Sequence, residues 1–160
     1  MQLCHSQQMG NEPAQIRLHG RLIDTLYTEA MLLADEARAY FERASAERDA
    51  LQPIDRVVFS CESLKVTTRL MHILSWLLSQ RAVEMGQIDR IEARMSTRRI
   101  GEAADSDPAT LAGLPAEAIA LIEASRELYA RVARLDAAEE PAEPAPSPAL
   151  NLLSRLESAF

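Results

Sequence analysis

The chain has 160 residues, of which 48% are hydrophobic and 26% charged, so one globular domain with its own core is expected. Only 5 residues are glycine and 4% are aromatic, which argues against an all-β sandwich or barrel. The net charge of −7 argues against nucleic acid as the main ligand, because phosphate contacts need clustered Lys and Arg.

The N-terminal part of the chain predicts a tail followed by a long helix. Residues 1–17 show no helical periodicity and contain turn-forming residues, so a flexible N-terminal tail is expected. From Ile23 to Ala44, apolar residues recur at steps of three and four. This spacing predicts an amphipathic helix over residues 21–48.

A second long helix is predicted over residues 53–85, after a short connection. Pro53 suits the first helical position, and Asp55 complements the positive end of the helix dipole. Gly86 is the expected C-terminal stop. A short link between two long helices predicts an antiparallel helical hairpin.

The later half of the chain predicts a third long helix and a tail. A short helix is predicted over residues 88–98, followed by an acidic, turn-rich loop over residues 101–113. The third long helix is predicted over residues 115–138. Residues 18–138 thus form an all-α, antiparallel three-helix bundle in this prediction. Residues 139–160 are predicted to be a Pro/Ala-rich linker and a disordered C-terminal tail with a short apolar segment.

The predicted second helix is apolar on two opposite faces, so it must be buried on both. We expect one face to be covered within the bundle, and its residues are Val57, Cys61, Leu64, Thr68, Met71, Ser75, Leu78 and Ala82. We expect the other face to meet a second copy in a homodimer, and its residues are Phe59, Val66, Leu70, Ile73 and Leu77. The alternative is that the short helix and the loop fold back over that second face.

A polar strip runs between the two faces of this helix. Trp and Arg are over-represented in binding hot spots, so the strip is a candidate surface for a partner protein. Its candidate partner-binding residues are Lys65, Arg69, Trp76 and Gln80. The alternatives are that Trp76 is capped by its own loop and that Lys65 and Arg69 pair with Glu62.

The apolar residues at the C-terminal end form a second candidate contact. On a flexible linker they would act as a docking peptide, since tethering raises the local concentration of a partner. These residues are Leu152, Leu153, Leu156 and Phe160. The alternative is an inert disordered end.

No residue pattern in the sequence predicts catalysis. His5, His19 and His72 show no metal-ligand spacing with the two cysteines, and there is no phosphate-binding loop or nucleophile elbow. We therefore expect no catalytic residue, no cofactor and no metal site. Cys4 and Cys61 suggest no disulfide framework, which favours a cytoplasmic protein. The apolar stretches are interrupted by polar residues, so no membrane span is expected.

The run Cys61–Gln87 resembles the RcdA family, the alphaproteobacterial regulators of CtrA degradation. Three segments carry the resemblance: ESLKVTTRLM (Glu62–Met71), SWLL (Ser75–Leu78) and QRAV (Gln80–Val83). The similarity is looser over the first helix, and beyond Gly101 only the order of loop, helix and tail is shared.

The resemblance implies a non-enzymatic three-helix bundle that dimerises and ends in a disordered tail. It also implies an adaptor that helps the AAA+ protease ClpXP capture CtrA, a cell-cycle response regulator. The implied co-adaptors are the receiver-domain protein CpdR and the cyclic-di-GMP effector PopA, and the implied location is a cell pole. The alternative function is a structural, polar-organising helical dimer without a substrate-delivery role.

Overall fold

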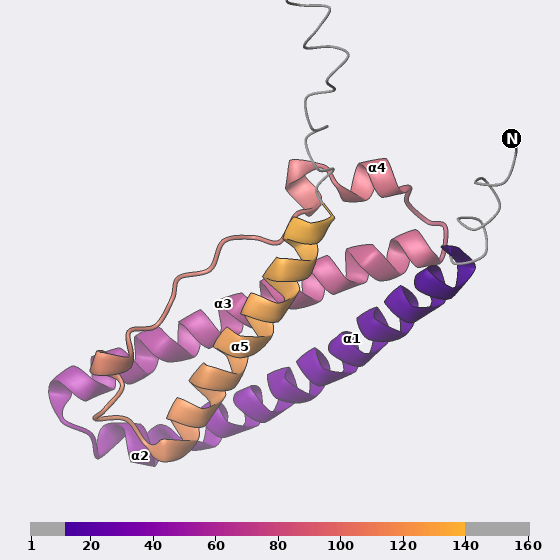
Figure 1. The fold of residues 1–160 in the computed structure, drawn as a ribbon. Coiled ribbons are helices and arrows are strands. Elements are labelled where there is room, and N and C mark those ends of the chain that lie inside the picture. The colour runs from indigo at the N-terminus through magenta and orange to yellow at the C-terminus, as the bar shows by residue number, and fades with distance from the viewer. Residues whose placement is uncertain (1–11, 140–160) are drawn as a thin grey trace, which may run out of the picture.

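The computed structural model describes residues 12–139, and the regular structure of this part is entirely helical. The helices are α1 (Glu12–Arg43), α2 (Ser45–Asp49), α3 (Pro53–Glu84), α4 (Arg90–Ala93), the 3-10 turns η1 (Ser96–Arg98) and η2 (Pro108–Thr110), and α5 (Ala116–Ala138). Figure 1 shows α1 and α3 side by side and antiparallel, with α5 crossing one side of the pair. The predicted all-α bundle of three long helices is therefore confirmed.

The first long helix starts earlier and stops sooner than predicted. It begins at Glu12 instead of Arg21, because Pro13 lies in the first turn, where its missing N–H costs no helical bond. The part of the predicted flexible tail that the structure describes is therefore helical. The helix is interrupted at Ala44, and the chain continues as the separate short helix α2.

The bounds of α3 follow the sequence signals closely. Pro53 occupies the first turn and Asp55 lies beside it, as predicted. After Glu84 the chain turns at Gly86, whose φ of 69° is in the left-handed region that glycine tolerates best. The N–H groups of Gly86 and Gln87 bond back to the carbonyls of Val83 and Ala82, which closes the last turn of the helix.

The predicted helix over residues 88–98 is split into two short pieces. Asp89 caps α4 by accepting a hydrogen bond from the Glu92 N–H, at 2.7 Å. The backbone of Met95 is extended, so the helix cannot continue into η1.

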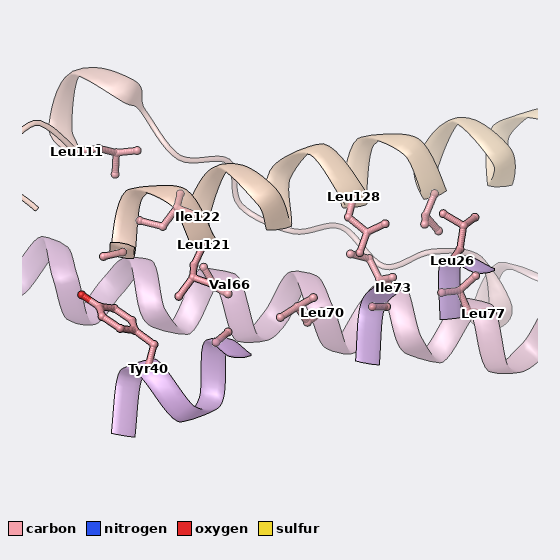
Figure 2. Close-up of a cluster of buried hydrophobic side chains, with 14 of the residues drawn as sticks. Leu26, Tyr40, Val66, Leu70, Ile73, Leu77, Leu111, Leu121, Ile122 and Leu128 are labelled. Atoms are coloured by element: carbon pink, nitrogen blue, oxygen red, sulfur yellow. The ribbon is translucent and has the colours of Figure 1, made fainter. Parts of the chain in front are cut away.

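The core lies where α3 meets α1 and α5. Figure 2 shows Val66 of α3 beside Leu121 of α5, and Ile73 of α3 beside Leu128 of α5. Leu111, from the segment that precedes α5, belongs to the same cluster. Helix α3 is therefore covered from two directions by its own chain.

The predicted dimer face of α3 is a core face of the single chain. Phe59, Val66, Leu70, Ile73 and Leu77 are each at most 4% exposed. The face that was expected inside the bundle is outside. The prediction reversed the two faces because both have apolar residues at helical spacing, and spacing does not tell which one the chain covers. The alternative named the short helix and the loop as the cover of this face, whereas the structure packs it mainly against α1 and α5, with Leu111 of the loop in the same cluster.

We expect Ile73→Ala to lower the free energy of unfolding by about 2–5 kcal/mol, because it opens a cavity in a closed core. Leu32→Ala on α1 is the matched control, since Leu32 is 66% exposed and its truncation should change stability by less than about 0.5 kcal/mol. Urea unfolding followed by the fluorescence of Trp76 would measure both. Equal stabilities for the two variants would contradict this description of the core.

Candidate functional site

A row of polar side chains follows one side of α3. Glu62, Arg69 and Trp76 recur every seven residues, so they lie along one line, and Gln80 extends it by one turn. We call these four residues the polar ladder. Each is at most 5% exposed, so the ladder faces other parts of the chain and not solvent.

The guanidinium group of Arg69 joins three parts of the fold. Its Nη2 donates to the Ala104 carbonyl at 2.9 Å and to the Ser106 hydroxyl at 2.5 Å. Its Nη1 donates to the hydroxyl of Ser125 on α5 at 3.1 Å. Burial lowers the pKa of Arg69, and the nearby carboxylate of Glu62 opposes that shift, so the group stays charged at neutral pH.

The carboxylate of Glu62 completes this cluster. It accepts a hydrogen bond from the Ser106 hydroxyl and another from the Lys65 ammonium, the latter at 2.8 Å. The Ser106 hydroxyl therefore lies between the carboxylate of Glu62 and the guanidinium of Arg69. Among the described residues, no buried side-chain nitrogen or oxygen lacks a hydrogen-bond partner. A fully paired polar cluster fixes the geometry of the elements that contribute to it.

The C-terminal half of the ladder, Trp76 and Gln80, forms hydrogen bonds with the end of α5 and the residue that follows it. The Trp76 indole N–H donates to the Asp136 carboxylate at 2.7 Å, and the Arg99 guanidinium donates to the same oxygen at 2.8 Å. One turn further, the Gln80 amide donates to the Glu139 carboxylate at 3.0 Å. Hydrogen bonds therefore connect the last turn of α5 to α3, next to the last residue that the structure describes.

The ladder positions the stretch between η1 and α5, residues 99–115, which we call the connecting segment. A Cβ atom at Gly101 would collide with the imidazole of His72, so glycine is required there for close approach. The Tyr129 hydroxyl donates to the Gly101 carbonyl at 2.7 Å. Leu111 and Leu114 belong to the segment, and both side chains are buried. The connecting segment is therefore held along α3 and α5, and it does not stand free.

An ion pair fixes the exposed side of the connecting segment. The Asp105 carboxylate accepts hydrogen bonds from the Arg126 guanidinium of α5 at 2.7 and 3.2 Å. These bonds lower the pKa of Asp105 to about 2. Exposed acidic or small side chains flank this pair at Glu102, Asp107 and Ala112. This part of the molecule is an acidic surface on an ordered backbone.

The structure corrects most of the predicted partner-binding strip. Arg69, Trp76 and Gln80 are buried and bonded within the chain, so as folded they are not available to a partner. The ammonium of Lys65 pairs with Glu62, as the alternative interpretation held, and the side chain stays partly exposed. The four C-terminal candidates Leu152, Leu153, Leu156 and Phe160 lie outside the described residues.

Sequence reasoning missed the acceptors of the ladder. Ser106, Ser125 and Asp136 carry no motif and lie far from α3 in the sequence. The sequence contains only an indirect signal for such acceptors. Glu62 and Arg69 lie on an apolar helix, and they require hydrogen-bonding partners if their side of that helix is buried.

Two hollows mark the surface around the ladder. One of about 330 Å³ opens between the connecting segment and α5, next to Asp105, Arg126 and Tyr129. A larger hollow of about 880 Å³ lies where α1 begins and where α3 and α5 end, and both Arg94 and Glu139 line it. Within residues 12–139, no group of His, Cys, Asp or Glu side chains is placed to hold a metal ion. No described helix is long and apolar enough to cross a membrane.

Comparison with known proteins finds a family model and a solved structure to which this chain is similar. The family model described as "Protein of unknown function (DUF1465)" matches residues 14–160. The fold is similar to the crystal structure of RcdA from Caulobacter crescentus CB15, with 33% sequence identity and a TM-score of 0.58. The similar region covers 72% of this chain and 88% of that one. A comparison with curated proteins returns no match.

We expect Arg69→Met to lower the free energy of unfolding by about 3–5 kcal/mol, because the buried hydroxyls of Ser106 and Ser125 would lose their charged donor and Glu62 would keep only Lys65 as a nearby cation. Adding Glu62→Gln should recover part of that loss, since the two residues share one network. Arg38→Met is the control, because Arg38 forms only exposed ion pairs on α1 and should cost less than about 1 kcal/mol. Equal losses in urea unfolding for Arg69→Met and the control would contradict the role of the ladder.

We expect Trp76→Phe to keep the helical content and to lower stability by about 1–3 kcal/mol, because Asp136 loses a buried donor. Circular dichroism and thermal unfolding would measure the two effects. Unchanged stability would show that the bond between Trp76 and Asp136 contributes nothing to the fold.

Proposed function

The chain belongs to the DUF1465 family of RcdA-like proteins, and on this basis we propose that it is a non-enzymatic adaptor in the regulated proteolysis of a CtrA-like response regulator by the ClpXP protease. The observation that carries the proposal is the 33% identity to RcdA over 88% of that chain. The implied co-adaptors are a receiver-domain protein and a cyclic-di-GMP effector, and the implied place of action is a cell pole.

We assign one partner contact to the connecting segment. Its backbone is held by the polar ladder and by the ion pair between Asp105 and Arg126, while Glu102 and Ala112 are exposed on it. A surface that is already ordered loses little conformational entropy when a partner binds. The acidic excess of this half of the chain favours a partner with a basic surface.

A second contact is assigned to the end of the bundle. Glu139 lines the larger hollow and is followed by the Pro/Ala-rich sequence that leads to Leu152, Leu156 and Phe160. Apolar residues on such a linker would keep a second partner near the first, because tethering replaces a separate encounter by a local one. An adaptor needs two contacts of this kind, one for the protease system and one for its substrate.

The proposal predicts that the purified chain speeds degradation of a CtrA-like response regulator by ClpXP when its co-adaptors are present. The substrate half-life with and without the chain is the measurement. If the half-life and the association of substrate with protease both stay unchanged, the delivery role is wrong. A tagged copy that still gathers at a cell pole without protease and substrate would then favour the polar-organising alternative.

The surface assignment is tested by the double variant Glu102→Arg with Ala112→Arg. We expect the stimulation of degradation to fall at least about fivefold, which corresponds to the loss of roughly 1 kcal/mol of binding. The matched control is Glu36→Arg with Ala39→Arg, which places the same changes on an exposed part of α1. Equal stimulation by both double variants would remove the connecting segment from the interface.

A further inference from the structure

The larger hollow, at the end of the bundle, has an apolar part that faces solvent. Ile16 of α1, Val83 of α3 and Ala93 of α4 contribute it. Ile16 is 50% exposed, and Ile91 and Met95, next to Ala93 in the sequence, are 79% and 57% exposed. Apolar side chains gathered at one exposed place mark an interaction surface. The volume of about 880 Å³ leaves room for several large side chains.

One wall of the hollow carries positive charge that the fold does not neutralise. Arg90 and Arg94 are one helical turn apart, and both are exposed and line the hollow. Within residues 12–139, neither of them forms an ion pair. The carboxylates of the hollow, Glu84 and Glu139, belong instead to the ends of α3 and α5. The wall formed by Arg90 and Arg94 is therefore complementary to an acidic segment.

The chain leaves the bundle at the edge of this hollow. The Glu139 carboxylate accepts a hydrogen bond from the Gln80 amide at 3.0 Å and lies 3.7 Å from Nε2 of His19. Figure 1 shows α4 and the end of α5 at the same end of the bundle as the start of α1. Residues 140–160 are therefore attached next to a surface that offers both apolar contacts and positive charge.

The sequence of residues 147–160 has the pattern of a short amphipathic helix. Ser147 and Pro148 are residue types preferred at the N-cap and at the first helical position. At 100° per residue, four large apolar side chains fall on about a third of the circumference, and the polar residues fall on the rest. These apolar residues are Leu152, Leu153, Leu156 and Phe160. A helix this short is marginal in water by itself, so it needs a surface that covers its apolar stripe.

We propose that residues 148–160 dock as an amphipathic helix in the hollow of their own chain. Glu140 and Glu143, the acidic residues of the linker, pair with Arg90 and Arg94 in this arrangement. The linker over residues 140–147 spans at most about 28 Å when extended, and it begins at the edge of the hollow. The helix can therefore bind to the chain that carries it.

The choice of the chain's own tail as the occupant follows from attachment and charge. Glu140 and Glu143 are the charged residues closest to the attachment point, and both have the sign that the arginine wall requires. The tail also carries an apolar stripe, which the exposed Ile16 and its neighbours can cover. The inference stands on the hollow and the tail, and it does not depend on the proposed adaptor role.

The tether makes a weak contact sufficient. A short linker holds the tail at a local concentration on the order of 1 mM, so a contact with a Kd of about 0.1 mM keeps about nine-tenths of the molecules docked. The apolar side chains of the tail are then hidden in the free chain. A partner that binds them must displace the tail first, and its apparent affinity falls about tenfold.

Hydrogen–deuterium exchange of the full chain, read on the peptide over residues 149–160, tests the docking. We expect its amides to exchange at least about fivefold more slowly than those of the free peptide. Ile16→Asp should restore the free rate, because it places a charge in the apolar part of the hollow. Leu18→Asp is the matched control, since Leu18 is 66% exposed on the same helix and does not line the hollow. A free rate in the wild-type chain, or equal rates in the two variants, would overturn the proposal.

The charge pairing has its own pair of variants. Arg90→Glu with Arg94→Glu should speed exchange of the tail at least about threefold, because the linker acids would meet like charges. Arg17→Glu with Arg21→Glu is the control, since these exposed arginines have the same spacing on α1 and do not line the hollow. Equal exchange in the two double variants would remove the arginine wall from the docking site.

A mixture of two variants distinguishes docking within one chain from docking between copies. The Ile16→Asp chain keeps an intact tail, while a Leu153→Asp chain keeps an intact hollow, and the two tail peptides differ in mass. We expect the intact tail to exchange at the free rate in the mixture, because its own hollow is blocked. Slower exchange of that tail after mixing would show binding to another copy and would overturn the intramolecular contact.

Discussion

The buried guanidinium of Arg69 imposes a constraint on the rest of the fold. A charge removed from water needs acceptors for its N–H groups, and a helix in an apolar core offers none of its own. The chain supplies them from three places: the carbonyl of Ala104, the hydroxyl of Ser106 and the hydroxyl of Ser125. Meeting this requirement fixes where the connecting segment and α5 lie against α3.

The connecting segment is consequently ordered by interactions below it. A stretch rich in small and acidic residues would bury little apolar surface by itself. Here Gly101 lies against His72, and Ser106 bridges Glu62 and Arg69. Only its outward side chains remain free to vary without loss of the fold. The same residues that stabilise the bundle therefore determine the shape of its acidic surface.

The sequence predicted the positions of the long helices well. It predicted poorly which faces of those helices pack together and which residues bond to the polar ladder. Pro53 and Gly86 act through the local backbone, so they located both ends of α3 correctly. Which face of α3 is buried depends on residues far away in the chain, and an apolar stripe looks the same inside a core or beneath a second subunit. Ser125 and Asp136 could not be recognised as ladder partners for the same reason, because only the fold brings them to Arg69 and Trp76.

The distribution of charge on α3 separates two kinds of contact. Contacts within the chain use the ladder side, where Glu62 and Arg69 find fixed partners and specify one arrangement of the segment above them. The opposite side of α3 is different, because Val57, Leu64, Met71 and Leu78 are exposed there and no charged residue lies among them.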